Sequence, residues 1–158
     1  MGKGYEEQGN EPIANGFYND AINNFKKALD LAYHAPEAHS LYVMALINVH
    51  KPDEALAHLE KMRQENIPYK SEGELLKMAQ AAVYFREYEL IKVIFTDLVE
   101  IAPQNPDYYI NLALAYAYLG DDQKAIEIAE SIKNINSGFT QQADLFIQGI
   151  KEGKFKEN

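Results

Sequence analysis

The stretch that decides the fold is residues 106–135, which read PDYYINLALAYAYLGDDQKAIEIAESIKNI. Pro106 followed by an acid is a helix-start signal, because proline suits the first helical position and acids favour the helix dipole. Gly120-Asp121-Asp122 is a turn cluster. On either side of it, apolar residues recur at the three- and four-residue spacing of an amphipathic helix. The stretch therefore predicts two helices joined by a tight turn.

The same pattern recurs at a nearly constant interval. Ala21 and Ala55 are 34 residues apart, Ala55 and Ile91 are 36 apart, and Ile91 and Ala125 are 34 apart. A fixed period with two helices in each period predicts one helical hairpin repeated four times. A single hairpin cannot bury its own apolar face, so the hairpins are expected to stack. No segment alternates with period two for long, and we expect no strands.

Turns and helix starts elsewhere fit this division. Pro36-Glu37 and Pro52-Asp53 repeat the helix-start signal of Pro106-Asp107. The other predicted turns are Asn15-Gly16, Lys51-Pro52-Asp53, Asn66-Ile67-Pro68 and Pro103 to Pro106. After the fourth hairpin, one more amphipathic stripe runs through Phe139, Ala143, Phe146, Ile147 and Ile150. This last helix is expected to cap the stack, and the charged residues from Lys151 to Asn158 are expected to fray.

Composition excludes several classes of function. The chain has 158 residues, and its 15 Lys and Arg against 24 Asp and Glu give a net charge of 15 − 24 = −9. That balance argues against a nucleic-acid binder, which needs clustered basic residues, and against a polybasic membrane-surface protein. Cysteine is absent, so disulfides and thiol catalysis are excluded. Without a visible signal peptide or an apolar run of about 20 residues, the chain as written is expected to be soluble and cytoplasmic.

The quoted residues resemble the tetratricopeptide repeat (TPR) family. The fourth unit carries the family's series of aromatic, Leu, small and Tyr residues at Tyr109, Leu112, Ala113 and Tyr116. The first unit carries a similar turn from Gly16 to Ile22, with Phe25 and Ala28 beyond it, and the third keeps Ala79, Tyr88, Phe95 and Pro103. The second unit matches least well, keeping Ala55 and Pro68 but having Val43 in a small-residue slot.

The resemblance implies a right-handed superhelical solenoid in a single domain over residues 1–151. Its repeats would cover about 2–35, 36–70, 71–105 and 106–138, followed by a capping helix over about 139–151 and a charged tail over 152–158. Pro12 departs from the family pattern, because it falls inside the expected first helix. It should kink or shorten that helix, since a proline in a helix interior costs about 3 kcal/mol.

No catalytic or metal site is expected. The four histidines, His34, His39, His50 and His58, do not form a metal-ligand pattern, and we expect them on the surface or at helix ends. The acid pairs Asp53-Glu54 and Asp121-Asp122 fit the first turns of helices. We therefore expect neither an enzyme nor a cofactor site.

In a TPR array the first helix of each hairpin lines a concave face, and the resemblance implies a partner-binding groove there. In this register the concave face includes Asn10, Ile13 and Ser40, and its predicted groove residues for partner binding are Met44, Ile47, Leu76, Gln80, Val83, Tyr84, Ile110, Leu114 and Tyr118. We expect the anchors to be Leu76, Tyr84, Ile110, Leu114 and Tyr118. A surface this apolar is typical of interaction sites. Two alternatives stay open: a register shifted by one would make these residues core, or the C-terminal helix covers part of the groove.

A family function can be tested residue by residue. Some TPR cochaperones hold the carboxylate end of a chaperone tail with basic and Asn side chains. The matching slots here hold Glu6, Asn10, Leu41, Gly73 and Lys77. Only Asn10 and Lys77 fit, and Glu6 would repel a carboxylate. We therefore do not expect this role.

The sequence thus favours a non-catalytic scaffold that binds a protein or peptide segment in its groove. A second hypothesis is a soluble accessory domain cut from a bacterial membrane enzyme. Residues 105–147 are similar to the C-terminal TPR tails of O-antigen ligase-like polymerases. In that case the localisation is unknown. An exposed apolar groove can also pair two copies in a homodimer, which is compatible with either hypothesis.

Overall fold

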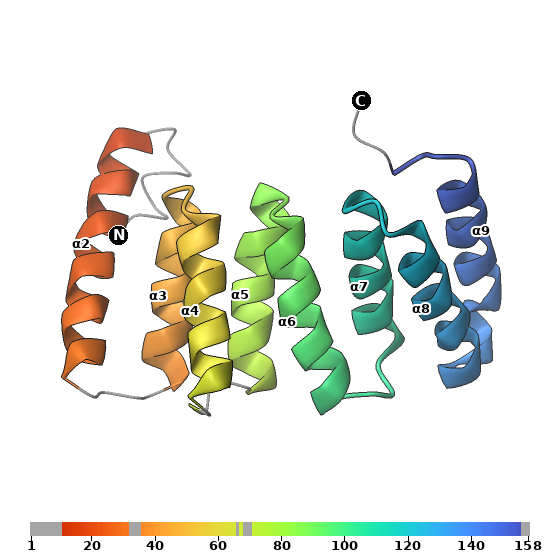
Figure 1. The fold of residues 1–158 in the computed structure, drawn as a ribbon, viewed down its shortest axis with the longest axis horizontal. Helices are drawn as coiled ribbons and strands as arrows, with labels where there is room; N and C mark the ends of the chain where they lie inside the picture. The colour runs from red at the N-terminus through yellow and green to blue at the C-terminus, as the bar shows by residue number, and fades with distance from the viewer. Residues whose placement is uncertain (1–10, 32–35, 66, 68–70, 156–158) are drawn as a thin grey trace. The chain divides into compact units, whose positions relative to one another are not determined.

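The computed structural model describes residues 11–31, 36–65, 67 and 71–155. These residues form eight α-helices and one short 3-10 helix, and they contain no strand. The helices are α2 (Glu11–Asp30), α3 (Pro36–Asn48), α4 (Pro52–Gln64), α5 (Glu72–Phe85), α6 (Tyr88–Ile101), α7 (Pro106–Tyr118), α8 (Asp122–Ile135), η1 (Ser137–Phe139) and α9 (Thr140–Lys151). The all-helical prediction is confirmed for this part of the chain (Figure 1).

The helix-start and turn signals work as expected in most places. Pro36, Pro52 and Pro106 are the first residues of α3, α4 and α7. Gly120, in the turn between α7 and α8, has φ +83°, a left-handed conformation that glycine adopts without strain. The Asn105 side chain accepts from the backbone N–H of Asp107, and Asp121 accepts from that of Lys124, so both helices have an N-cap.

The predicted turn at Asn15-Gly16 is wrong, because α2 runs through it without a break. A glycine inside a helix costs about 1 kcal/mol relative to alanine. The apolar stripe continues across the glycine, however, and both Ala14 and Ile22 are buried. Their burial outweighs the local preference for a turn. Pro12 lies in the first turn of α2 as the helix is described, where proline is tolerated.

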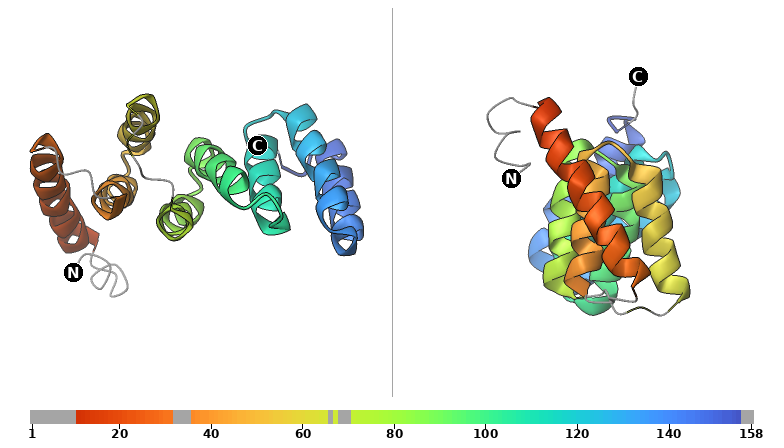
Figure 2. Two further views of the ribbon diagram at one scale, coloured as in Figure 1. Left: turned by 90° about the horizontal axis from the view of Figure 1, so that it is seen from below. Right: turned by 90° about the vertical axis from the view of Figure 1, so that its left-hand side faces the viewer.

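The chain divides into two compact units, Met1–Phe85 and Arg86–Asn158. In the first unit, α3 is the central helix, and it packs against α2, α4 and α5 (Figure 2). Its core includes Val43, Leu46, Leu59, Met62, Leu75 and Met78. In the second unit, α6 packs on α7, α7 on α8, and α8 on α9. Its core includes Leu90, Ile94, Leu98, Ala113, Ala125, Ala129 and Ile132.

Small residues decide how closely the helices of the second unit approach one another. Ala113, Ala115, Ala125 and Ala129 are all fully buried. Larger neighbours such as Leu98 and Ile132 fill the space beside them. This alternation of small and large side chains gives the close packing that helix pairs need.

Candidate partner-binding surface

The nine predicted groove residues lie on three helices. Met44 and Ile47 are on α3 and the second group is on α5, so both belong to the first unit; the third group is on α7, in the second unit. The α5 group is Leu76, Gln80, Val83 and Tyr84, and the α7 group is Ile110, Leu114 and Tyr118.

On α5 the predicted residues form an exposed row, hereafter the α5 row: Leu76, Gln80, Val83 and Tyr84. Leu76 is 41% exposed, Val83 46% and Tyr84 77%, and Gln80 is exposed as well. Gln80 is four residues after Leu76, and Val83 and Tyr84 are three and four residues after Gln80, so these side chains lie on one side of the helix. The other side of α5, with Leu75, Met78, Ala79 and Ala82, is buried. On this helix the predicted residues are surface residues and not core.

On α3 the prediction is partly wrong. Ile47 is fully buried and belongs to the core of the first unit, and Met44 is half-buried. The reason is that α3 packs against three other helices and keeps little free surface. Leu41 on the same helix is 43% exposed, although the predicted groove did not include it.

On α7 the three predicted residues are half-buried, and residues from the C-terminal part of the chain lie beside two of them. The ring of Tyr118 stacks on Tyr88, with the centroids 4.3 Å apart, and meets the edge of Phe155 at 5.7 Å. Ile110 lines a small cavity together with residues of η1 and α9. These contacts favour the second of the two alternatives, in which the C-terminal helix covers part of the predicted surface.

Phe155 is the residue whose role the sequence reasoning missed. It follows α9, and its ring packs against both Tyr118 and Phe146. Gly149 makes room for it, because a Cβ at that position would lie 3.1 Å from Phe155 Cε2. Gly153, with φ +71°, supplies the turn that brings the ring back. A lone aromatic in a charged tail, six residues after a helical glycine, was the available signal.

We expect Phe155→Ala to lower the free energy of unfolding by about 1–2 kcal/mol, roughly half the cost of truncating a fully buried Phe, because the ring is half-buried. Thermal unfolding followed by circular dichroism measures the loss. Lys154→Ala is the matched control, because Lys154 is exposed and its ion pair is with Glu152 at the surface. Equal effects of the two substitutions would mean that Phe155 does not hold the tail in place.

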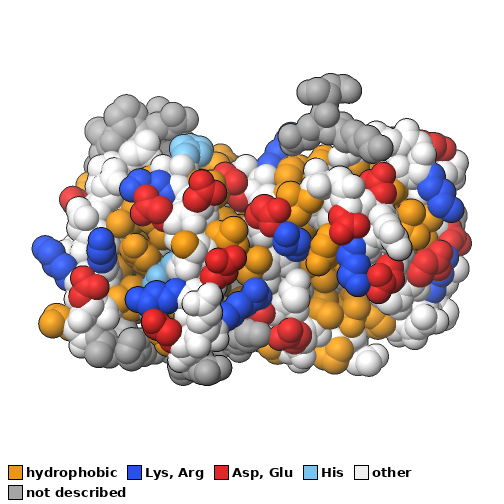
Figure 3. Space-filling view, in the orientation of Figure 1, with side chains coloured by type: hydrophobic (Ala, Val, Ile, Leu, Met, Phe, Trp, Pro, Cys, Tyr) orange, Lys and Arg blue, Asp and Glu red, His pale blue; other side chains and the backbone are white. Residues whose placement is uncertain are grey.

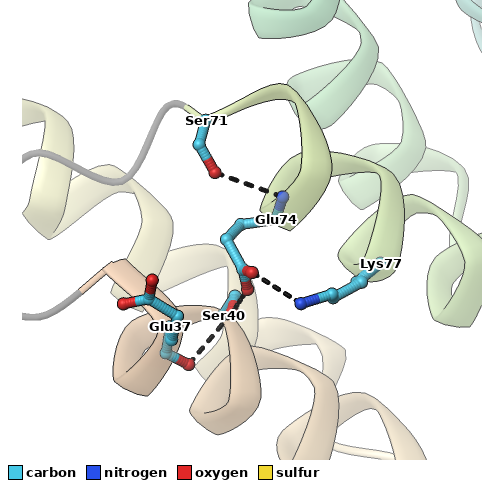
Figure 4. Close-up of polar contacts among 5 residues, drawn as sticks. All are labelled: Glu37, Ser40, Ser71, Glu74 and Lys77. Atoms are coloured by element: carbon cyan, nitrogen blue, oxygen red, sulfur yellow. Dashed lines mark hydrogen bonds and ion pairs between the residues drawn. The ribbon is translucent and has the colours of Figure 1, made fainter.

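A polar cluster joins α3 to α5 close to the α5 row. The Ser40 hydroxyl donates to Glu74 Oε2, and Lys77 Nζ lies 2.6 Å from Glu74 Oε1 (Figure 4). The Ser40 hydroxyl also lies 3.0 Å from the carbonyl oxygen of Glu37, which is an alternative acceptor for its single proton. The hydrogen bond from Lys77, helped by that from Ser40, lowers the pKa of Glu74 below its usual value. The buried carboxylate is therefore held in its charged form.

The backbone around Glu74 explains how its side chain comes to point at α3. Its N–H donates to Ser71 Oγ at 3.3 Å, which is half of the capping box that Ser-x-x-Glu encodes at a helix start. The Glu74 side chain contacts Ser40 and Lys77 instead of completing the box. The Ser71-x-x-Glu74 spacing was the signal for this cluster.

Two of the histidines, His39 and His58, are not placed as predicted. His39, on α3, is buried, and its Nδ1 lies 3.0 Å from Nε2 of His58 on α4. The Tyr42 ring meets the His58 ring edge-on at 4.7 Å. His39 and His58 thus form a hydrogen-bonded pair between two helices. His50 lies in the turn before α4, as expected, and His34 lies outside the described residues.

Burial, together with the positive charges that His39 and Lys61 can carry, lowers the pKa of His58 from 6.5 to about 4. A hydrogen bond between two imidazoles needs one donor and one acceptor nitrogen, and an imidazolium has no acceptor. The hydrogen bond is therefore lost only when both rings are protonated, and the lowered pKa of His58 keeps that ring neutral near pH 7. Within the described part of the chain, no three His, Cys, Asp or Glu side chains gather into a group that could hold a metal ion.

The charges on the surface show no concentration of one sign on the face drawn in Figure 3, where acidic and basic side chains are interspersed. Many are neighbours on one helix, such as Lys51 with Glu54 at 2.8 Å and Lys124 with Glu127 at 2.9 Å. Such pairs leave no basic patch on this face for a phosphate backbone. Of the helices described, none combines the length and the apolar character needed to cross a membrane.

Comparison with known proteins adds no family to this description. A scan against models of protein families gives no match, and a search of curated proteins gives no relative.

Proposed function

We propose that this chain is a non-catalytic, TPR-like helical-repeat scaffold that binds a segment of a partner protein on the α5 row. The observation that supports the proposal is the exposure of Leu76, Val83 and Tyr84 on one side of a single helix whose other side is buried. The row runs from Leu76 to Tyr84, and the eight helical rises between them correspond to about 12 Å along the helix axis. That length matches two turns of a helical segment or about four residues of an extended one.

The chemistry of the row favours an apolar anchor with polar contacts around it. Burying a large apolar side chain contributes on the order of 1.5–3 kcal/mol, and Tyr is among the residues that most often dominate binding energy at interfaces. Gln80, between the apolar residues, can both donate to and accept from a peptide group. Lys77 beside the row is already paired with Glu74, so it is a poor receptor for a free carboxylate.

This geometry also supports the expectation that the chain does not hold carboxylate-terminated chaperone tails. Leu41 is an exposed apolar residue at one of the slots where that function needs a polar side chain, and Gly73 offers no side chain at another. Glu6 and Asn10 lie outside the described residues. The partner segment that the α5 row suits is apolar at its centre, and the net charge of −9 favours basic flanks.

Tyr84→Lys tests the proposal. A photo-crosslinking phenylalanine analogue at position 84 first identifies the partner in cells, and the purified partner is then titrated against the protein by calorimetry. We expect Tyr84→Lys to weaken binding at least ten-fold, about 1.4 kcal/mol, while the melting temperature stays within a degree or two, because Tyr84 is 77% exposed.

Leu31→Lys is the matched control. Leu31, directly after α2, is 84% exposed, so the substitution removes a comparable apolar side chain and adds the same charge. We expect it to leave the affinity unchanged. Equal loss in both variants would show that charge and not the α5 row decides binding. Unchanged affinity in both would place the partner elsewhere on the chain.

A further inference from the structure

A small cavity in the second unit lies where α7, α8 and α9 meet. Its volume is about 90 Å³. The six residues that line it are Ile110, Ile132, Phe139, Gln142, Ala143 and Phe146. Ile132 is 2% exposed whereas Gln142 is exposed, so the cavity reaches from the surface to the core.

The cavity exists because of one small residue and one turn. Ala143, on the inner side of α9, is 3% exposed and leaves space that a larger side chain would fill. The turn η1, which Asn136 caps by accepting from the N–H of Gly138 at 2.9 Å, carries Phe139 at the start of α9. The rings of Phe139 and Phe146 both line the cavity, and these residues come four before and three after Ala143 in the sequence.

The size of the cavity limits what it can hold. Sites for cofactors and drug-sized molecules are usually 300–1,000 Å³, several times larger. A space of 90 Å³ suits one branched aliphatic side chain. Five of the six lining residues are apolar, so the occupant cannot carry a charge into the cavity. The amide of Gln142 can pair with a peptide group that approaches the surface there.

The charges on the neighbouring helix surfaces favour a basic partner. Lys133 on α8 is bound on both sides, to Glu130 at 2.8 Å and to Asp144 at 2.5 Å. This cluster carries two acids and one base, and both acids are more than half exposed. It lies next in sequence to two lining residues, Ile132 and Ala143. A segment with Lys or Arg on either side of its apolar residue is complementary to it.

We infer that this cavity is a second polypeptide-binding site, which takes a leucine-sized side chain from a Lys- or Arg-flanked segment of a partner protein. The inference extends the proposed function to a site in the other unit and does not use the α5 row. The exposed amide of Gln142 binds the segment's backbone, and the acidic pair around Lys133 attracts its basic flanks.

Methyl NMR with defined peptides tests the site, because two isoleucines and one alanine line it. The probe is Lys-Lys-Lys-Gly-Leu-Gly-Lys-Lys-Lys with blocked ends, titrated into protein labelled at Ile and Ala methyl groups. We expect saturable shifts of the Ile110, Ile132 and Ala143 methyl signals, with a Kd on the order of 1 mM for such a short contact. The same peptide with Ala at its centre should give at least ten-fold weaker binding, and so should one with Glu flanks.

Ala143→Leu is the blocking variant, since the added side chain fills the cavity from inside. We expect this substitution to weaken binding of the leucine peptide at least ten-fold, while the helical circular-dichroism signal and the melting temperature stay unchanged. Gln142→Ala, at an exposed position, is a second variant that cannot disturb the core, and it should weaken binding about three-fold or more. Persistence of the Ile110 and Ile132 shifts in a folded Ala143→Leu protein would overturn the inference.

Other occupants give distinct results, and each would overturn it. Shifts of the same methyl groups on raising the protein concentration without peptide would mean that a second copy fills the cavity. Shifts with dissolved xenon but with none of the peptides would mean a packing void only. Tyr84→Lys separates the two proposals. The inference requires that the peptide-induced methyl shifts persist in this variant. If the variant no longer binds the partner but still shows these shifts, the result concerns the α5 row alone.

Discussion

Lowering the pH from 6.5 to about 4 is expected to cost the first unit on the order of 3 kcal/mol of unfolding free energy through His58 alone. Its pKa falls from 6.5 to about 4 on folding, because the ring is buried and lies against His39 with Lys61 nearby. Each pKa unit corresponds to about 1.4 kcal/mol. For a domain whose total stability is about 5–15 kcal/mol, this loss is large.

The sign follows from which state binds the proton. Between pH 6.5 and 4 the unfolded chain protonates His58 and the folded chain does not, so acid favours unfolding. Above pH 6.5 both states are neutral at this residue and the stability is fully present. Below about 4 both are charged, and this residue causes no further loss. In the folded state, protonation of both rings would also replace the His39–His58 hydrogen bond by repulsion.

Chemical unfolding at half-unit pH steps measures the dependence, and the ¹H–¹³C signals of the His58 ring give the folded pKa directly. His58→Phe keeps a ring against His39 and Tyr42 but cannot titrate. We expect it to be less stable at pH 7 and to have a flatter profile between pH 6.5 and 4. Parallel profiles for the two proteins would show that His58 does not carry the effect.

This histidine pair illustrates what the sequence could not show. His39 and His58 are 19 residues apart on different helices, and nothing in a single-helix pattern says that their rings face each other. The helices themselves follow from local signals, because proline starts, Gly120 and the apolar spacing act within a few residues. Contacts between helices depend on rotation about each axis, and the pattern leaves that rotation open.

The candidate surface shows the same difference between local patterns, which the sequence predicts, and contacts between helices, which it does not. The side of α5 that bears Leu76, Gln80, Val83 and Tyr84 was predicted as surface from the register of the TPR resemblance, and the buried residues of this helix do lie on the opposite side. Ile47 was misplaced because α3 is apolar nearly all round and its pattern gives no preferred side. The turn at Asn15-Gly16 failed for a related reason, since the burial of Ala14 and Ile22 outweighs a local turn preference.

Glu74→Ala is expected to destabilise the first unit by about 2–3 kcal/mol, far more than the loss of an ordinary surface carboxylate. The side chain accepts from the buried Ser40 hydroxyl and from Lys77, and hydrogen bonds to a charged group contribute about 1.5–3 kcal/mol. The substitution leaves Lys77 free to be solvated, because its side chain is 57% exposed. Most of the cost therefore comes from the contact between α3 and α5.

Glu54→Ala is the matched control. Glu54 and Lys51 form the same kind of ion pair, three residues apart, but both side chains are about half exposed. Such pairs contribute at most about 1 kcal/mol and often nothing measurable. A double-mutant cycle with Ser40→Ala then isolates the coupling across the helix contact, which we expect to be at least 1 kcal/mol. A coupling near zero would mean that Ser40 and Glu74 do not act together in solution.

The pH dependence separates this cluster from the histidine pair. Because folding lowers the pKa of Glu74, its contribution is fully present above the usual glutamate pKa of 4.5 and is lost as the pH falls through the folded value. The His58 contribution is lost at higher pH, between 6.5 and about 4. Glu74→Gln should therefore flatten the stability profile below pH 4.5 and leave the slope above pH 5 intact. His58→Phe should do the reverse. If instead both variants flatten the same region, the two clusters unfold as one coupled group through α3, the helix that carries both Ser40 and His39.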